Sequence, residues 1–163
     1  MADGESVPRL VLISGATGVG KTTLAKAVAH EMGLARIASS DTIREVMRAT
    51  ASSSNPALNR SSYGRGEVGD AGTDWEDAAR AVEPGIDAVV ERARQQGVDL
   101  VLEGVHVVPS RRLLSAWESA GGAAVGVVVK IEDEDTHRER ICLLYTSDAA
   151  DDTPCVDLGG RRI

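Results

Sequence analysis

Phenylalanine is absent from this 163-residue sequence, and tryptophan and tyrosine occur only twice each. Lysine and arginine together number 18 against 25 acidic residues, so the formal net charge is −7, and the basic residues form no run. Basic patches combined with stacking aromatic side chains are the usual means of binding nucleic acid. We therefore expect no nucleic-acid partner.

The sequence also lacks a long hydrophobic run. No apolar segment approaches the roughly 20 residues that a membrane-spanning helix needs. The N-terminus, MADGESVPRL, has neither the basic start nor the apolar stretch of a signal peptide. These absences predict a cytoplasmic protein without a membrane partner.

Cysteine occurs only at Cys142 and Cys155, both within the final stretch CLLYTSDAADDTPCVDLGGRRI. The sequence before Cys142 can therefore form no disulfide of its own and no thiolate metal site. No second histidine or cysteine stands at ligand spacing from His106, so the spacing does not indicate zinc.

Short apolar runs alternate with segments of helical spacing, which is typical of a parallel sheet with helices on both faces. The expected strands are residues 10–14, 35–40, 98–108 and 123–131, and the expected helices are residues 22–32, 41–49, 74–96 and 109–121. Residues 50–73 are rich in Ser, Gly, Asn and Arg and predict a long loop. Pro84 and Gly85 should break or kink the third helix. The pattern predicts a three-layer α/β/α fold with a mostly parallel sheet.

The motif GATGVGKT follows the first predicted strand and opens the first predicted helix, and it matches G-x-x-x-x-G-K-[ST] at every fixed position. Glycines allow backbone N–H groups to surround a phosphate at a helix start. A lysine at this position contacts the β- and γ-phosphates, and the following hydroxyl binds magnesium. We expect ATP and Mg²⁺ as ligands, with Lys21 also catalytic and Thr22 at the metal. The predicted nucleotide-binding residues are Gly15, Ala16, Thr17, Gly18, Val19, Gly20, Lys21, Thr22 and Thr23.

The sequence favours a small-molecule kinase over a GTPase switch. The guanine-reading motif N-K-x-D is absent, and the only D-x-x-G begins at Asp157 in the final stretch. Glu103 closes the third apolar run, where a magnesium-associated acid belongs, and is predicted as a metal residue. A plain charge at a strand end is the alternative.

Polar residues near the predicted carboxyl edge of the sheet are candidates for the acceptor side. Asp41 could orient or deprotonate an acceptor hydroxyl, or cap the helix that follows, and both roles are compatible. Arg44 and Arg48 share a helix face that suits the binding of an anionic group. The alternative is that the two arginines only form a solvent-exposed helix face. His106 could contact substrate or be a structural residue of a strand.

A polar helix is expected to begin shortly after the fourth strand. Arg138 and Arg140, with His137, could close over the triphosphate as a lid, and Arg138 is predicted to bind the nucleotide. A solvated helix start is the alternative reading of these charges.

Several segments, in order, resemble the 2-phosphoglycerate kinase family of phosphate-loop kinases. The resemblance spans most of residues 9–141 and includes SSDTIREVMRA, LNRSSY, VLEGVHVVP and EDEDTHRER. It implies ATP-dependent phosphorylation of 2-phosphoglycerate to 2,3-bisphosphoglycerate. A kinase of another small metabolite and a nucleotide-binding regulator without turnover are the alternatives.

The resemblance ends in the lid segment, so we expect residues 1–141 to be a kinase domain that lacks its C-terminal strand and helix. Residues 142–163 resemble translated read-through of a transposase-type sequencing adapter, in two matching pieces, CLLYTSDAADD and VDLGGRRI. A native polar tail is the alternative. A sheet with a missing edge strand would expose apolar surface, so we expect this chain to fold poorly or to be inactive.

Overall fold

The computed structural model describes residues 7–51, 55–59 and 71–148. Its strands are β1 (Arg9–Gly15), β2 (Ile37–Ser39), β3 (Leu100–Glu103) and β4 (Ala123–Val129). Its helices are α1 (Lys21–Met32), α2 (Ser40–Thr50), α3 (Pro56–Asn59), α4 (Ala71–Gln95), α5 (Arg111–Ser119) and α6 (Glu134–Asp148). The expected alternation of strands and helices is confirmed.

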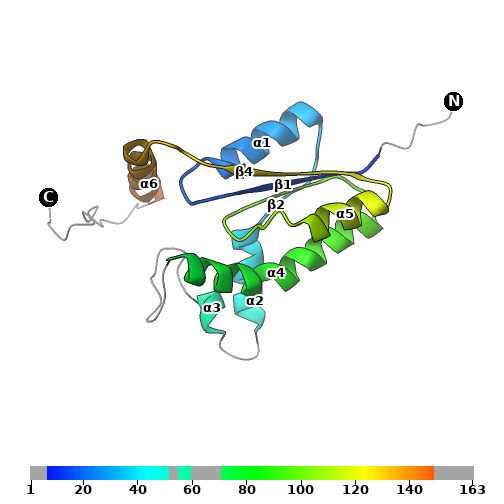
Figure 1. Ribbon diagram of the computed structural model, residues 1–163, viewed down its shortest axis with the longest axis horizontal. Helices are drawn as coiled ribbons and strands as arrows, with labels where there is room; N and C mark the ends of the chain where they lie inside the picture. The colour runs from blue at the N-terminus through cyan, green and yellow to red at the C-terminus, as the bar shows by residue number, and fades with distance from the viewer. Residues whose placement is uncertain (1–6, 52–54, 60–70, 149–163) are drawn as a thin grey trace, which may run out of the picture.

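Within the described residues the four strands form one sheet in the order β2-β3-β1-β4, and every neighbouring pair is parallel. Figure 1 shows α1 on one face of this sheet, and α4 and α5 on the other. Parallel strands end at the same edge, so the residues that follow β1, β2 and β3 are brought together there. The predicted three-layer α/β/α arrangement is confirmed.

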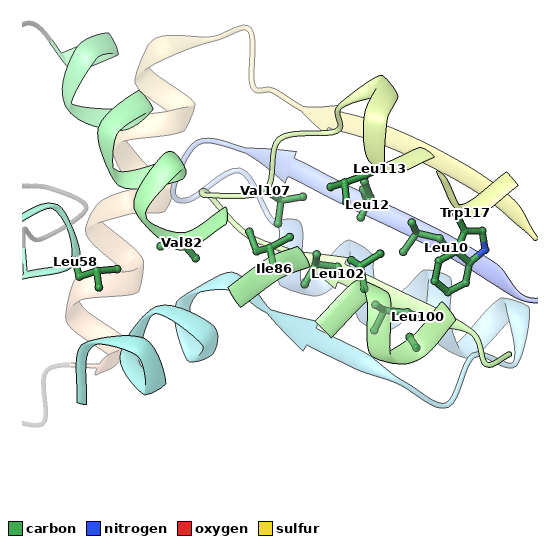
Figure 2. Packing of buried hydrophobic residues seen from close by; sticks show 12 residues of the cluster. Leu10, Leu12, Leu58, Val82, Ile86, Leu100, Leu102, Val107, Leu113 and Trp117 are labelled. Atoms are coloured by element: carbon green, nitrogen blue, oxygen red, sulfur yellow. The ribbon is translucent and has the colours of Figure 1, made fainter. Parts of the chain in front are cut away.

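The two faces of the sheet bury different sets of side chains because successive residues of a strand point to opposite sides. Leu10, Leu12, Leu100 and Leu102 face α4 and α5, where they pack with Trp117 and other apolar residues (Figure 2). Val11, Ile13 and Val101 face α1. The sheet therefore has a hydrophobic core on each side.

The structure modifies two sequence expectations about the elements. The predicted strand over residues 98–108 ends at Glu103, because Gly104 takes a φ of +146° and the chain turns away after the last hydrogen bond of the β1–β3 ladder, from the Gly104 N–H to the Ile13 carbonyl. The helix expected to break or kink at Pro84 and Gly85 does not break: α4 is one helix with Pro84 inside it, and its two halves run in different directions in Figure 1. Gly85 lies against Ile43 and Met47, so packing on α2 helps to hold the helix together there.

The predicted loop over residues 50–73 contains the short helix α3. Helix α2, which precedes the loop, extends to Thr50. Much of this segment, with residues 60–63 of the LNRSSY motif, lies outside the described residues, as do residues 149–163 of the final stretch. Helix α6 continues past Cys142, so the proposed boundary at that residue falls inside a helix.

Strand β4 is the outer strand of the described sheet on the side of β1, and part of its apolar surface is open. Val125, Val127 and Val128 are all exposed, in agreement with the expectation that this sheet exposes apolar surface. The described residues contain no helix that is both long and apolar enough to cross a membrane.

Gly104 is expected to tolerate no side chain. A Cβ at this position would overlap the Ser40 hydroxyl, and the positive φ is itself strained for other residues. Gly104→Ala should therefore lower the free energy of unfolding by about 3–5 kcal/mol. Gly97→Ala is the matched control, because Gly97 also has a positive φ but nothing near the added atom, and it should cost about 1–2 kcal/mol. Urea unfolding of both variants checks this, and equal losses would contradict it.

Candidate active site

The glycine-rich loop connects β1 to α1 with a backbone that only glycine adopts readily. Gly15, Gly18 and Gly20 have φ values of 145°, 81° and 93°. Gly20 occupies the N-cap position of α1 without a side-chain capping hydrogen bond, so the first N–H groups of the helix are not satisfied by a cap. A helix start of this kind is an anion-binding geometry, in agreement with the predicted phosphate loop.

The loop is also closely packed from outside. A Cβ on Gly15 would overlap the Val129 carbonyl at the end of β4, and one on Gly18 would lie 2.8 Å from Cγ1 of Ile141. The glycines are thus required by their neighbours as well as by their backbone angles.

Lys21 is buried at the first position of α1, and its Nζ donates to the Ala16 carbonyl at 2.6 Å. Burial lowers the pKa of this ammonium, while the nearby Glu103 and Asp41 carboxylates act in the opposite direction. The Lys21 charge is therefore held at the phosphate loop, near the carboxylates of Glu103 at the end of β3 and Asp41 near the start of α2.

Thr22 and Glu103, the two predicted metal residues, are in direct contact. The Thr22 hydroxyl donates to Oε1 of Glu103 at 3.1 Å, and Glu103 is buried. The described residues contain no group of three or more His, Cys, Asp or Glu that could hold a metal ion. A hydroxyl and one carboxylate nevertheless suit Mg²⁺, which keeps most of its ligands as water and substrate phosphate oxygens.

Asp41 and His106 meet beside this pair. Oδ1 of Asp41 lies 3.5 Å from Nδ1 of His106, and the Ser40 hydroxyl lies 3.4 Å from the same nitrogen. Burial lowers the pKa of His106, with Arg44 and Lys21 adding to the effect and Asp41 opposing it. These effects favour the neutral imidazole, whose Nδ1 is within reach of both the Ser40 hydroxyl and the Asp41 carboxylate.

The structure corrects two readings of these residues. Asp41 is not the cap of α2, because the helix starts one residue earlier and Ser39 accepts the N–H of Asp41 at 3.2 Å. His106 does not lie on a strand, because β3 ends at Glu103 and His106 falls in the turn that follows. The side chain of Asp41 is 64% exposed and thus accessible to an acceptor.

Arg44 and Arg48 lie on the same face of α2 as Asp41, and both contact Glu45. Nη2 of Arg48 is 2.6 Å from Oε2 of Glu45, and Nη2 of Arg44 is 3.4 Å from Oε1. The expected pair of guanidinium groups is present, and it holds a carboxylate of the protein itself.

Helix α6 begins beside the phosphate loop. Nε2 of His137 donates to the Thr17 carbonyl at 2.6 Å, and Ile141 approaches Gly18. Arg138 instead pairs with Glu134 at 3.1 Å and is 59% exposed. In this structure the predicted lid helix thus reaches the loop through His137 and Ile141, whereas Arg138 has partners on its own helix.

A cavity of about 370 Å³ was not predicted from the sequence. It opens between α4 and the connection from β3 to α5, and His106 is part of its wall. The indole N–H of Trp75 donates to the Val105 carbonyl at 2.7 Å across this region. Its lining comes from residues 75–86 and 106–113. Only the tertiary packing of α4 brings these distant segments together, so no local pattern could reveal the cavity.

Comparison with known proteins agrees with this geometry. The sequence model of the AAA domain family matches residues 10–142, which include the phosphate loop, Asp41, Glu103 and His106. The 2-phosphoglycerate kinase of Methanothermobacter thermautotrophicus is 34% identical over 145 residues, covering 82% of this chain and 46% of that protein. The 2-phosphoglycerate kinase of Thermococcus kodakarensis is 42% identical over 107 residues, covering 61% of this chain and 37% of that protein.

The resemblance to 2-phosphoglycerate kinases is thus confirmed as a similarity over most of this chain. The chain spans less than half the length of these curated relatives.

Solved structures extend the comparison to the fold. A protein of Chloroflexus aurantiacus has a TM-score of 0.54 at 19% identity, covering 94% of this chain and 72% of that one. A protein of the PezAT toxin-antitoxin system of Streptococcus pneumoniae has a TM-score of 0.53 at 16% identity, covering 88% of this chain and 57% of that one. At these identities the likeness concerns the fold alone. The match of the family model over residues 10–142 shows that the chain belongs to the AAA domain family, and its fold is the α/β fold of phosphate-loop proteins.

Proposed function

We propose that this chain carries the nucleotide site and the acceptor side of an ATP-dependent kinase that converts 2-phosphoglycerate to 2,3-bisphosphoglycerate. The observation that carries the proposal is the meeting of Lys21, Thr22 and Glu103 at the phosphate loop, with Asp41 and His106 beside them. The names of the archaeal relatives support the choice of acceptor.

The phosphate loop, Gly15–Thr23, would hold the phosphates of ATP through its backbone N–H groups. Lys21 would leave the Ala16 carbonyl, or share its protons with it, to contact the β- and γ-phosphates. Thr22 and Glu103 would hold Mg²⁺, which supplies positive charge against the phosphate oxygens when it is bound. Helix α6, attached to the loop through His137, would cover the same side.

Asp41 would act on the acceptor. In the proposed reaction an acceptor hydroxyl oxygen forms a bond to the γ-phosphorus, the bond from that phosphorus to ADP breaks, and the hydroxyl proton passes to the Asp41 carboxylate. His106, neutral and 3.5 Å away, would orient this carboxylate. The cavity next to His106 would provide room for a small acceptor.

Two alternatives remain distinct from this proposal. A kinase of another small metabolite would use the same nucleotide site with a different acceptor, and a nucleotide-binding regulator would bind ATP without turnover. ATP consumption stimulated by 2-phosphoglycerate supports the proposal. Stimulation only by a different acceptor favours the first alternative, and ATP binding without stimulated consumption favours the second.

Lys21→Ala should weaken ATP binding about tenfold to a hundredfold, because it removes a charge-assisted contact to phosphate. Lys26→Ala is the matched control, since Lys26 lies on the same helix with an exposed side chain. Isothermal titration with ATP and Mg²⁺ measures both variants. Equal affinities for the two variants would exclude Lys21 from the nucleotide site.

Glu103→Gln should weaken the binding of Mg²⁺, whereas the affinity for ATP measured without Mg²⁺ should stay unchanged. The neutral amide still fills the space and can still accept from Thr22, but it lacks the charge that suits a hard cation. We expect the apparent Mg²⁺ affinity to fall about 10- to 100-fold. A titration of Mg²⁺ at saturating ATP tests this, and an unchanged midpoint would remove Glu103 from the metal site.

We further propose that residues 142–163 are not native to the kinase domain of residues 1–141. The end of the family match at residue 142 supports this. Amplification and sequencing of the source gene should give a different continuation after about Ile141. A genomic copy that encodes CLLYTSDAAD would refute the proposal.

A further inference from the structure

One face of α2 carries an arrangement that the proposed reaction does not yet use. Arg44 and Glu45 are neighbours in the sequence, and each is three or four residues from both Asp41 and Arg48, so the four side chains lie along the same side of the helix. Asp41 stands at the helix start, beside His106 and near Lys21. The face thus leads from the proposed reaction centre outward along α2.

Glu45 bridges the two arginines. Its Oε2 accepts from both Nε and Nη2 of Arg48, at 3.0 and 2.6 Å, and its Oε1 accepts from Nη2 of Arg44 at 3.4 Å. Each carboxylate oxygen therefore has a different guanidinium partner. This is the contact that an incoming carboxylate or phosphate would make with the same pair.

Exposure favours exchange of this carboxylate. The Glu45 side chain is 48% exposed and that of Arg48 51% exposed, whereas Arg44 is only 15% exposed. Exposed ion pairs contribute little net stability, so the protein loses little when another anion replaces Glu45. Arg44 is also close enough to His106 for its charge to lower the pKa of that imidazole, which places it next to the acceptor side.

We propose that Arg44 and Arg48 form the anion-binding site for the acceptor, and that Glu45 is a built-in competitor that the acceptor must displace. The ligand is a small hydroxy acid or phosphate ester whose anionic group replaces the Glu45 carboxylate. Glu45 thereby sets the selectivity, because a neutral hydroxyl compound cannot displace it. This inference rests on the proposed kinase function for the identity of the acceptor.

The test is equilibrium binding of 2-phosphoglycerate, without nucleotide, to the complete chain at low ionic strength. Glu45→Gln should tighten binding at least about fivefold, because the amide competes poorly for two guanidinium groups. Glu45→Asp should also tighten binding, though less, because it keeps the charge but its shorter side chain holds the arginines less well. Glycerol 2-phosphate and glycerate, titrated in parallel, show whether the phosphate or the carboxylate makes the exchange.

Glu91→Gln is the matched control. Glu91 pairs with Arg94 at 2.6 Å with the same three-residue spacing and a similar exposure of 46%, but on α4. It should leave 2-phosphoglycerate affinity unchanged, and thermal melting should show that all three variants remain folded.

Three results would overturn the inference. Unchanged or weaker binding in Glu45→Gln would show that Glu45 does not compete. If Glu45→Gln tightens binding but Glu45→Asp binds like the wild type, the effect comes from the net charge of the chain and not from competition for the arginines. Equal tightening in Glu91→Gln would lead to the same conclusion. ATP binding that depends on Lys21 is measured separately, so a failure of the nucleotide site is distinguishable from a failure of the anion site.

Discussion

The contact between Ser40 and Gly104 fixes the geometry on which the site depends. Ser40, the first residue of α2, is fully buried against the backbone of Gly104, the first residue after β3. Gly104 is in turn tied to β1 by its hydrogen bond to the Ile13 carbonyl. The start of α2, the end of β3 and the end of β1 are therefore packed at one point without room for a single additional carbon atom.

Three of the groups proposed to act in the reaction, Asp41, Glu103 and His106, lie at that junction. Glu103 immediately precedes Gly104 and reaches Thr22 on α1, and Asp41 immediately follows Ser40 and reaches His106. Lys21 and Glu103 are both buried, and the Glu103 carboxylate acts on the charge of the Lys21 ammonium. Because the two charges are opposite, burying them together costs less free energy than burying one of them without the other. Asp41 on α2 and Glu103 and His106 around the end of β3 thus come from two segments but share one point of support.

Local sequence patterns were sufficient where one physical rule dominated. Apolar runs identified the strands, and the glycine spacing identified the phosphate loop, because both depend on neighbouring residues only. The patterns were insufficient where contacts between distant segments determine where an element ends. Pro84 does not end α4, since α2 packs against the next residue, and β3 stops at Glu103, since Gly104 has a positive φ and begins a turn. The pairing of Thr22 with Glu103 was expected from their roles, whereas the pairing of Arg138 within α6 and the cavity beside His106 were not.

The two tryptophans stand in opposite environments, and this has a practical consequence. Trp117 is 1% exposed and fixed by a hydrogen bond from its indole to the Pro8 carbonyl, at the end of the sheet far from the loop. Trp75 is 39% exposed and forms part of the cavity wall. The fluorescence of the chain therefore contains one signal that follows the integrity of the core and another that follows solvent at the cavity, and replacing either indole by phenylalanine, a residue the chain otherwise lacks, separates them.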